Sequence, residues 1–316
     1  MRWGMIGTRG LVDKGGLNAF DKAENAELVA ALSSDPDRAK EFGAQHDLET
    51  STAEIDEFLA APGLEAVWIA SPTWRHHEQG RAAIAAGKHV LLEKPLAIDP
   101  EKAWDLVSAA KDVGVVLATG YQGRYVPGHL TMKRLIDEGA VGDVTVARTY
   151  YGIHRPGPPP EWRQKRDTAR WGALSDVGTH HVDLLRMLLG EISEATGYFE
   201  RQQAFETDDA AAAALRMKSG AVASLAISTN AWIQYTRVEV HGTDGALFAE
   251  DTNPAGQGKV TLLRRDEEPE DVTGETPNAW VAQLETVTRV MEGEDVPYAT
   301  GEDGARNLEI LEQIIP

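Results

Sequence analysis

The sequence contains no cysteine, so disulfide bonds, thiolate metal ligands and cysteine nucleophiles are all excluded. It also lacks an apolar run of about 18 residues, and we therefore expect no membrane-spanning helix. The opening MRWGMIG lacks the long apolar stretch of a signal peptide, and the expected location is cytoplasmic. Basic side chains number 31 against 50 acidic ones, a formal net charge of −19. This charge disfavours partners such as nucleic acids or anionic membranes.

The 316 residues, 42% of them hydrophobic, are enough for two domains with sizeable cores. Up to residue 122, short apolar runs such as Trp3–Ile6 alternate with helical patterns such as Pro100–Val113, which predicts βαβ units and a parallel sheet. Beyond it, strand-like runs follow one another from Ala195–Arg201 to Ala246–Ala249, which predicts a mainly antiparallel or mixed sheet. We predict an α/β protein with domains at residues 1–122 and 123–316.

A glycine-rich turn, Gly7-Thr8-Arg9-Gly10, follows the first expected strand. Such a turn suits a nucleotide, because glycine permits the sharp bend and the backbone N–H groups then face a pyrophosphate. The usual G-x-G-x-x-G is absent, since Arg9 takes the place of the second glycine and Gly10 comes early. Arg9 either obstructs the cofactor or lies against a phosphate as a cation. We predict cofactor contacts from this turn and from Leu11.

The residues after the second expected strand bear on the choice of nicotinamide cofactor. An acid there binds the ribose of NAD and repels the 2′-phosphate of NADP. Aligning Pro36-Asp37-Arg38 with the usual helix opening puts Ser33 in the place of the acid, and Arg38 can pair with a phosphate. Asp35 favours NAD(H) if the loop is shifted by two residues. We predict a preference for NADP(H), with contacts from Ser33, Ser34 and Arg38.

Four stretches together resemble the Gfo/Idh/MocA family of oxidoreductases, with spacing nearest to its 1,5-anhydrofructose reductase-like members. They are Ala70-Ser-Pro-Thr-Trp-Arg-His76, Gly87-Lys-His-Val-Leu-Leu-Glu-Lys-Pro95, Arg124-Tyr-Val-Pro127 and Asp176-Val-Gly-Thr-His180 with Asp183. The resemblance covers residues 2 to about 311. It implies a Rossmann dinucleotide-binding domain followed by a substrate-binding and oligomerisation α/β domain with a large open sheet. That sheet commonly packs against another subunit, so a homodimer or homotetramer is expected. Thr73 and Gly120 depart from asparagines common in the family.

Lys94 stands at the carboxyl end of an expected parallel strand, where open α/β sheets bind their ligands. Pro95 ends that strand and can adopt a cis bond. The resemblance implies that Lys94 contacts the nicotinamide ribose and the reacting oxygen of the substrate, where an ammonium group stabilises alkoxide-like charge. A solvated lysine paired with Glu93 is the alternative. The resemblance also implies cofactor contacts from Ser71, Pro72, Thr73, His76, Glu93, Trp162 and Arg163.

Asp176 and His180 are four residues apart and would share one face of a helix. A carboxylate beside an imidazole orients the ring and favours its protonated form. His180 would donate a proton to a carbonyl during reduction or remove one from an alcohol during oxidation. His181 points elsewhere and is expected to be structural. The predicted catalytic residues are thus Lys94, Asp176 and His180.

Polar side chains around the expected cleft suit a small sugar or polyol better than an apolar ligand. Besides the catalytic three, Tyr121, Arg124 and His154 are candidates for substrate contacts, and each could equally be structural. No metal is predicted, because no two histidines have the i, i+4 spacing of helical ligands and hydride transfer needs no metal.

We predict an NAD(P)-dependent oxidoreductase acting on CH–OH groups. Its favoured reaction is the NADPH-linked reduction of a sugar-like carbonyl. The alternatives are an NAD-dependent polyol, inositol or diol dehydrogenase of the same family, and a non-catalytic nucleotide-binding regulator.

Overall fold

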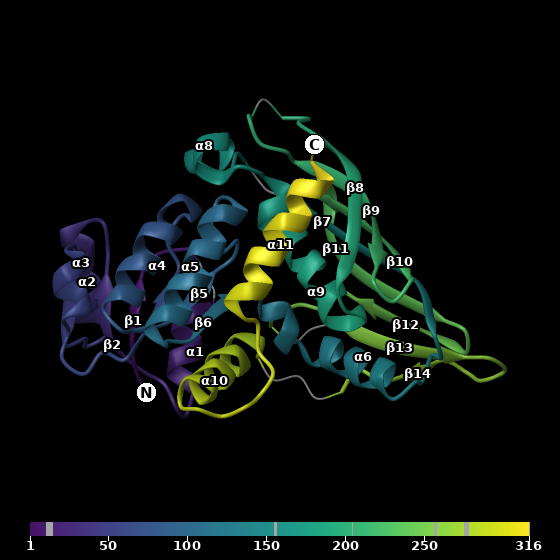
Figure 1. Ribbon diagram of the computed structural model, residues 1–316, viewed down its shortest axis with the longest axis horizontal. Helices are drawn as coiled ribbons and strands as arrows, with labels where there is room; N and C mark the ends of the chain where they lie inside the picture. The colour runs from purple at the N-terminus through teal and green to yellow at the C-terminus, as the bar shows by residue number, and fades with distance from the viewer. Residues whose placement is uncertain (11–14, 155–156, 204, 256–257, 275–277, 316) are drawn as a thin grey trace. The chain divides into compact units, whose positions relative to one another are not determined.

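The computed structural model describes residues 1–10, 15–154, 157–203, 205–255, 258–274 and 278–315 (Figure 1). The chain forms two compact units. The first contains Met1–Gly120 and Trp280–Ala305, and the second contains Tyr121–Ala279 and Arg306–Pro316. Each unit is built on one β-sheet. In the described residues, no helix is both long and apolar enough to cross a membrane.

The first unit contains a six-stranded parallel sheet in the order β3-β2-β1-β4-β5-β6. Its strands are β1 (Arg2–Ile6), β2 (Glu27–Leu32), β3 (Thr50–Thr52), β4 (Ala66–Ile69), β5 (His89–Glu93) and β6 (Leu117–Gly120). The accompanying helices are α1 (Leu17–Lys22), α2 (Pro36–Gln45), α3 (Ile55–Leu59), η2 (Thr73–Arg75), α4 (His76–Ala85) and α5 (Pro100–Val113). The predicted Rossmann arrangement is confirmed, with the strand order reversing between β1 and β4, where dinucleotides bind in this fold.

A returning segment completes the core of the first unit. Helix α10 (Ala279–Met291) contributes Leu284 and Val287 to the apolar cluster that contains Trp3 and Trp68. The rings of Trp68 and Trp280 stack with centroids 6.2 Å apart. The sequence placed all residues after 122 in the second domain. In the structure, Trp280–Ala305 instead belongs to the first unit, because the apolar face of α10 is buried there.

The second unit contains an eight-stranded sheet in the order β14-β13-β12-β11-β7-β10-β9-β8, in which only β7 and β10 pair in parallel within the described residues. The strands are β7 (Val144–His154), β8 (Ile192–Glu200), β9 (Ala210–Met217), β10 (Val222–Ser228), β11 (Asn230–Gly242), β12 (Gly245–Glu250), β13 (Lys259–Arg264) and β14 (Glu270–Asp271). Its helical segments are η3 (Gln122–Tyr125), α6 (Pro127–Asp137), α7 (Glu161–Gln164), α8 (Arg166–Ala169), the π-helical η4 (Leu174–Gly178), α9 (Thr179–Leu189) and α11 (Gly301–Ile314), whose first turn belongs to the first unit.

One face of this second sheet is covered and the other is open. Figure 1 shows α6 and α9 on the same side of the sheet, and along β7 the side chains alternate accordingly. Ala147 and Thr149 are buried, whereas Val146 and Tyr150 are 42% and 38% exposed. The alternation has the period of two that a half-covered sheet requires. The predicted open, mainly antiparallel sheet is thus confirmed.

Candidate functional site

Gly7 lies among the carboxyl ends of β1, β2 and β4 in the first unit. Its backbone has φ +107°, and its N–H donates to the carbonyl of Leu32 at 2.9 Å. A Cβ atom here would lie 3.0 Å from the carbonyl oxygen of Ala70, so the position requires glycine on both counts. Gly10 also has a positive φ, +75°, and a Cβ there would meet no atom of the described residues within 4 Å. Arg9, between the two glycines, is exposed.

Ser33 occupies the end of β2 and faces the glycine turn. It is 3% exposed, and its hydroxyl lies 3.3 Å from that of Thr8. Asp35, the rival acid of the sequence analysis, caps helix α2 by accepting from the backbone N–H groups of Asp37 and Arg38 at 3.1 Å. These bonds, together with the nearby Arg38 guanidinium, lower the pKa of the Asp35 carboxyl.

His76, at the start of α4, ties together the loops that follow β4 and β5. Its Nδ1 lies 2.8 Å from the carbonyl oxygen of Pro95, and its Nε2 lies 2.8 Å from that of Ser71. Both partners are acceptors, so the ring can donate to both only when it is protonated. The Ser71 hydroxyl in turn donates to Gln79. His76 is only 1% exposed. Because both ring nitrogens bond backbone carbonyls and the side chain is buried, His76 positions the loop that carries Lys94 and does not present a free ring atom to a ligand.

Glu93 and Lys94, adjacent in sequence, differ in their surroundings. Glu93 is 5% exposed and its carboxylate accepts from the Trp68 indole N–H at 3.2 Å. A Cβ at Gly120 would come within 2.7 Å of that carboxylate, which gives a physical reason for glycine at that position. Lys94 is partly exposed beyond the strand, and the Lys94–Pro95 peptide bond is cis.

In the second unit, Arg163 forms an ion pair with Asp176 and lies over the ring of Trp162, with 4.8 Å between the guanidinium carbon and the ring centroid. The sequence analysis assigned Arg163 to the cofactor and Asp176 to His180, and it did not anticipate the pair between them. Asp176 lies in the π-helical η4 and His180 in α9, so a wider turn separates the two residues than the regular helix that was expected.

A buried acid that the sequence analysis missed holds the chain just before Asp176. Asp208 accepts from the backbone N–H groups of Gly172 at 2.6 Å and Leu174 at 2.8 Å, and burial raises the pKa of its carboxyl. A Cβ at Gly172 would lie 2.0 Å from the Asp208 carbonyl oxygen, so only glycine permits this approach. The available signal was an acidic pair, Asp208 and Asp209, at the start of the strand-like run Asp209–Met217.

Helix α9 carries His180 against Tyr121. The two rings meet edge to face with centroids 5.8 Å apart, and the Tyr121 hydroxyl lies 2.7 Å from that of Thr179. Tyr121 is fully buried, and burial raises the pKa of its hydroxyl. Of the two roles left open by the sequence, this environment favours the structural one: Tyr121 supports the helix that presents His180.

A polar network fixes the other side of α9. Arg124 donates two hydrogen bonds to Asp183, at 2.8 and 2.7 Å, and Asn307 of α11 donates a third at 3.0 Å. Arg186 donates to the side-chain oxygen of Asn307 at 2.9 Å. The Asp183 side chain is 2% exposed and that of Arg124 is 15% exposed. Arg124 therefore anchors α9, which again favours the structural alternative of the sequence analysis.

The remaining candidates are distributed as follows. Ser34 and His154 are exposed, Thr73 is buried, Pro72 is partly buried, and Leu11 lies outside the described residues. Lys94 belongs to the first unit, whereas Asp176 and His180 belong to the second. Within the described residues, no group of three or more metal-ligating side chains is placed to hold a metal ion.

Comparison with known proteins identifies the two halves of the chain separately. Residues 1–121 match the oxidoreductase family with an NAD-binding Rossmann fold, and residues 129–248 match the GFO/IDH/MocA C-terminal domain. The chain belongs to the Gfo/Idh/MocA family. This membership confirms the predicted enzyme class, an NAD(P)-dependent oxidoreductase.

Several members of the Gfo/Idh/MocA family are similar over most of the chain. A 1,5-anhydro-D-fructose reductase from Ensifer adhaerens is 30% identical over 97% of this chain and 93% of its own. A scyllo-inositol 2-dehydrogenase (NADP(+)) from Bacillus subtilis is 27% identical over 82% of this chain and 78% of its own. A levoglucosan dehydrogenase in complex with NADH and levoglucosan is 25% identical, with a TM-score of 0.89 over 100% of this chain and 96% of its own.

Proposed function

We propose that this protein reduces the carbonyl group of a sugar-like substrate with NADPH and catalyses the reverse oxidation of a secondary alcohol. Family membership over both halves of the chain, together with the presence of Lys94, Asp176 and His180, carries the proposal. Relatives named for anhydrofructose, levoglucosan and inositol support a polyhydroxylated substrate. An NAD-dependent polyol, inositol or diol dehydrogenase is the alternative within the family.

Each catalytic side chain has a separate role in the proposed reaction. When bound, the nicotinamide supplies or accepts the hydride at C4. Lys94, at the end of β5, donates a hydrogen bond to the substrate oxygen and stabilises its developing negative charge. His180 delivers the proton to that oxygen during reduction and removes it during oxidation. Asp176, held by Arg163, orients the His180 ring and contacts a substrate hydroxyl.

Paired substitutions test these roles. Lys94→Ala and His180→Ala should each lower kcat about 10²–10⁴-fold, because each removes a group that acts in the transition state. Lys111→Ala and His46→Ala provide charge- and size-matched controls, and both should keep the activity of the parent. If Lys94→Ala and His180→Ala turn over like the parent, the proposed mechanism is refuted. The same assay separates an enzyme from a nucleotide-binding regulator, which would bind cofactor but turn over none of the sugars tested.

The NADP(H) preference rests on the neutral Ser33 at the end of β2 and on the guanidinium of Arg38. Asp35 is engaged as the cap of α2, but its carboxylate also pairs with Arg38 at 3.1 Å. NADPH binding by this route therefore requires Arg38 to exchange that partner for the 2′-phosphate. Arg38→Gln should raise KM for NADPH about tenfold and leave KM for NADH nearly unchanged, since a charge-assisted bond is lost only with NADPH. Lys40→Gln, an exposed change on the same helix, is the control. A parent enzyme that clearly prefers NADH would contradict the assignment.

The open face of the second sheet supports a homodimer or homotetramer. Val222 on β10 is 48% exposed and Tyr198 on β8 is 86% exposed, alongside Val146 and Tyr150 of β7. Several exposed apolar side chains on one face of a sheet are typical of subunit interfaces. Light scattering of the parent and of Val222→Asp measures the effect: the variant should have a lower mass, whereas a monomeric parent would exclude this interface. A cytoplasmic location remains part of the proposal.

A further inference from the structure

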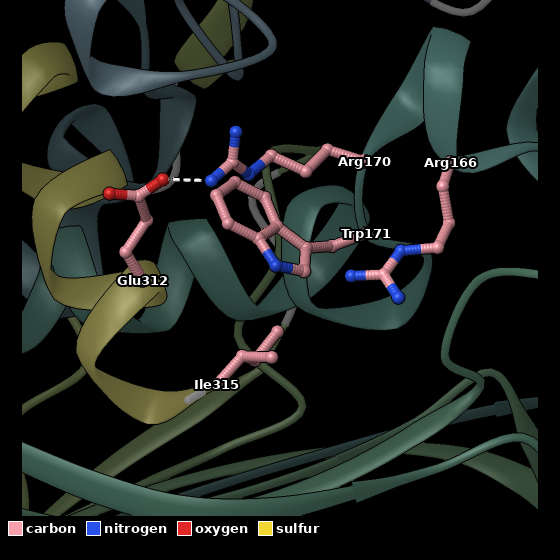
Figure 2. A pocket seen from close by; sticks show the side chains of 5 residues that line it. All are labelled: Arg166, Arg170, Trp171, Glu312 and Ile315. Atoms are coloured by element: carbon pink, nitrogen blue, oxygen red, sulfur yellow. Dashed lines mark hydrogen bonds and ion pairs between the residues drawn. The ribbon is translucent and has the colours of Figure 1, made fainter.

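A pocket of about 610 Å³ lies in the second unit, and none of the residues that line it is assigned to hydride transfer. It is lined by Arg166, Arg170, Trp171, Glu312 and Ile315. Figure 2 shows the Arg170 side chain lying across the indole of Trp171 and reaching Glu312, while the Arg166 side chain approaches the indole from another direction. The volume is in the range of small-molecule sites, which spans roughly 300–1,000 Å³.

The backbone at the rim of this pocket adopts a rare conformation. Arg170 has φ +59° and ψ −57°, and the N–H of Trp171 donates to the carbonyl of Ala169 at 2.7 Å. These values define a γ-turn of the strained kind, unusual for a residue with a side chain. Backbone strain of this type persists where the surrounding structure holds it, often at ligand sites. Here the turn directs the Arg170 guanidinium over the Trp171 ring, 4.8 Å from its centroid.

The charges of the pocket favour an anion. Arg170 forms an ion pair with Glu312, so these two side chains neutralise each other. Within the described part of the chain, Arg166 forms no ion pair, and only its backbone N–H contacts a carboxylate, that of Glu206 at 3.1 Å. The pocket therefore carries one surplus positive charge on a chain whose net charge is −19. A cation that faces a pocket without a carboxylate partner is well placed to bind an oxyanion.

The hydrogen-bonding groups agree with the charge. Trp171 is 4% exposed, and among the described residues its indole N–H has no acceptor and is not one of the buried unpaired nitrogens, so it is accessible to solvent or to a ligand. Together with the guanidinium groups of Arg166 and Arg170, the pocket offers three N–H-bearing groups and a single carboxylate, which Arg170 already engages. A purely structural role, in which the segment around Arg170 is held to α11, would require only the ion pair between Arg170 and Glu312. That role leaves Arg166 and the indole N–H unexplained.

We propose that this pocket binds a small metabolite through a carboxylate or phosphate group, with Arg166 as the main cation and the Trp171 indole N–H as a second donor. None of these residues is assigned to hydride transfer, so the inference does not depend on the proposed function. Its ligand class is a compact oxyanion attached to a larger molecule, because the cavity exceeds the size of a bare ion.

Nuclear magnetic resonance of the indole N–H groups tests the site directly. The chain has eight tryptophans, and Trp171→Phe assigns the signal of interest. Inorganic phosphate and, separately, acetate are titrated at constant ionic strength into the full-length parent, Arg166→Gln and the charge-matched control Arg265→Gln. The Trp171 signal should shift and saturate in the parent and the control, whereas Arg166→Gln should weaken the affinity about tenfold.

Saturation by phosphate alone assigns a phosphate ester, and saturation by acetate assigns a carboxylate. A shift that rises without saturating, or equal affinity in Arg166→Gln and the parent, would overturn the proposal. Superimposable backbone spectra establish that both variants are folded, so a loss of binding in Arg166→Gln is distinguished from unfolding.

Discussion

Replacing Asp183 by asparagine should strongly destabilise α9, although the change preserves the size of the side chain. The Asp183 carboxylate accepts two hydrogen bonds from Arg124 and one from Asn307, and its side chain is only 2% exposed. Removing one partner of a buried pair costs about 3–5 kcal/mol, because the remaining charge stays desolvated. Because the Arg124 side chain is 15% exposed, water partly solvates its charge, and we expect a loss of stability of about 3 kcal/mol, the lower end of that range.

The matched control is Asp137→Asn, because Asp137 pairs with Lys133 on the surface of α6, where its side chain is 56% exposed. Exposed pairs contribute about 0–1 kcal/mol. Hydrogen exchange of the backbone amides in α9 measures the effect, since this helix lies wholly within the second unit and its opening does not require the first to unfold. Equal protection of α9 in Asp183→Asn and Asp137→Asn would refute the assigned role of the network.

Burial lowers the pKa of His129 to about 4 and of His181 to about 3, so below pH 6.5 the unfolded chain binds more protons than the folded protein. The free energy of unfolding should therefore be highest above pH 6.5. Between pH 6.5 and 4 it should fall by about 1.4 kcal/mol for each histidine and each pH unit. Urea unfolding at pH 7 and 5 measures this, and a His129→Gln variant with the parent's pH slope would contradict it. Gly172→Ala should destabilise the protein by about 2 kcal/mol or more and lower kcat, because the added carbon collides with the backbone of Asp208. Gly123→Ala is the control, since its added carbon meets no atom of the described residues within 4 Å. Equal melting temperatures of the two variants would exclude the predicted collision at Gly172. Gly7→Ala should cost about 1–3 kcal/mol from its positive φ and weaken NADPH binding, and unchanged cofactor titrations would count against the pyrophosphate turn.

The first sheet was predictable because its signals are local. Short apolar runs mark its strands except β3 (Thr50–Thr52), which has no apolar residue and gives no such signal. Helix Pro100–Val113 has the predicted limits, with Gly114 in the left-handed conformation at its end. The family signatures then located the candidate residues at strand ends and on α9 without requiring tertiary structure.

The sequence could not supply contacts that depend on long-range packing. The Arg163–Asp176 pair and the Asp208 anchor join segments that lie 13 or more residues apart, and no local pattern records which acid meets which partner. Likewise, the burial of Tyr121 and the partial burial of Arg124 follow from the arrangement of α9 and α11, although both look like surface polar residues in isolation. The location of Trp280–Ala305 in the first unit has the same origin.

That returning segment has a consequence for how the protein is made. The stacked partner of Trp68 is Trp280, and residues Ala299 and Thr300 bond to β6. A ribosome that has released only the first 120 residues has therefore not yet supplied the α10 side of their core. About 170 more residues must be synthesised before α10, which ends at Met291, can cover the apolar surface of the nascent Rossmann half. We expect fragments ending near residue 120 to aggregate, and gene fusions that separate the halves there to fail.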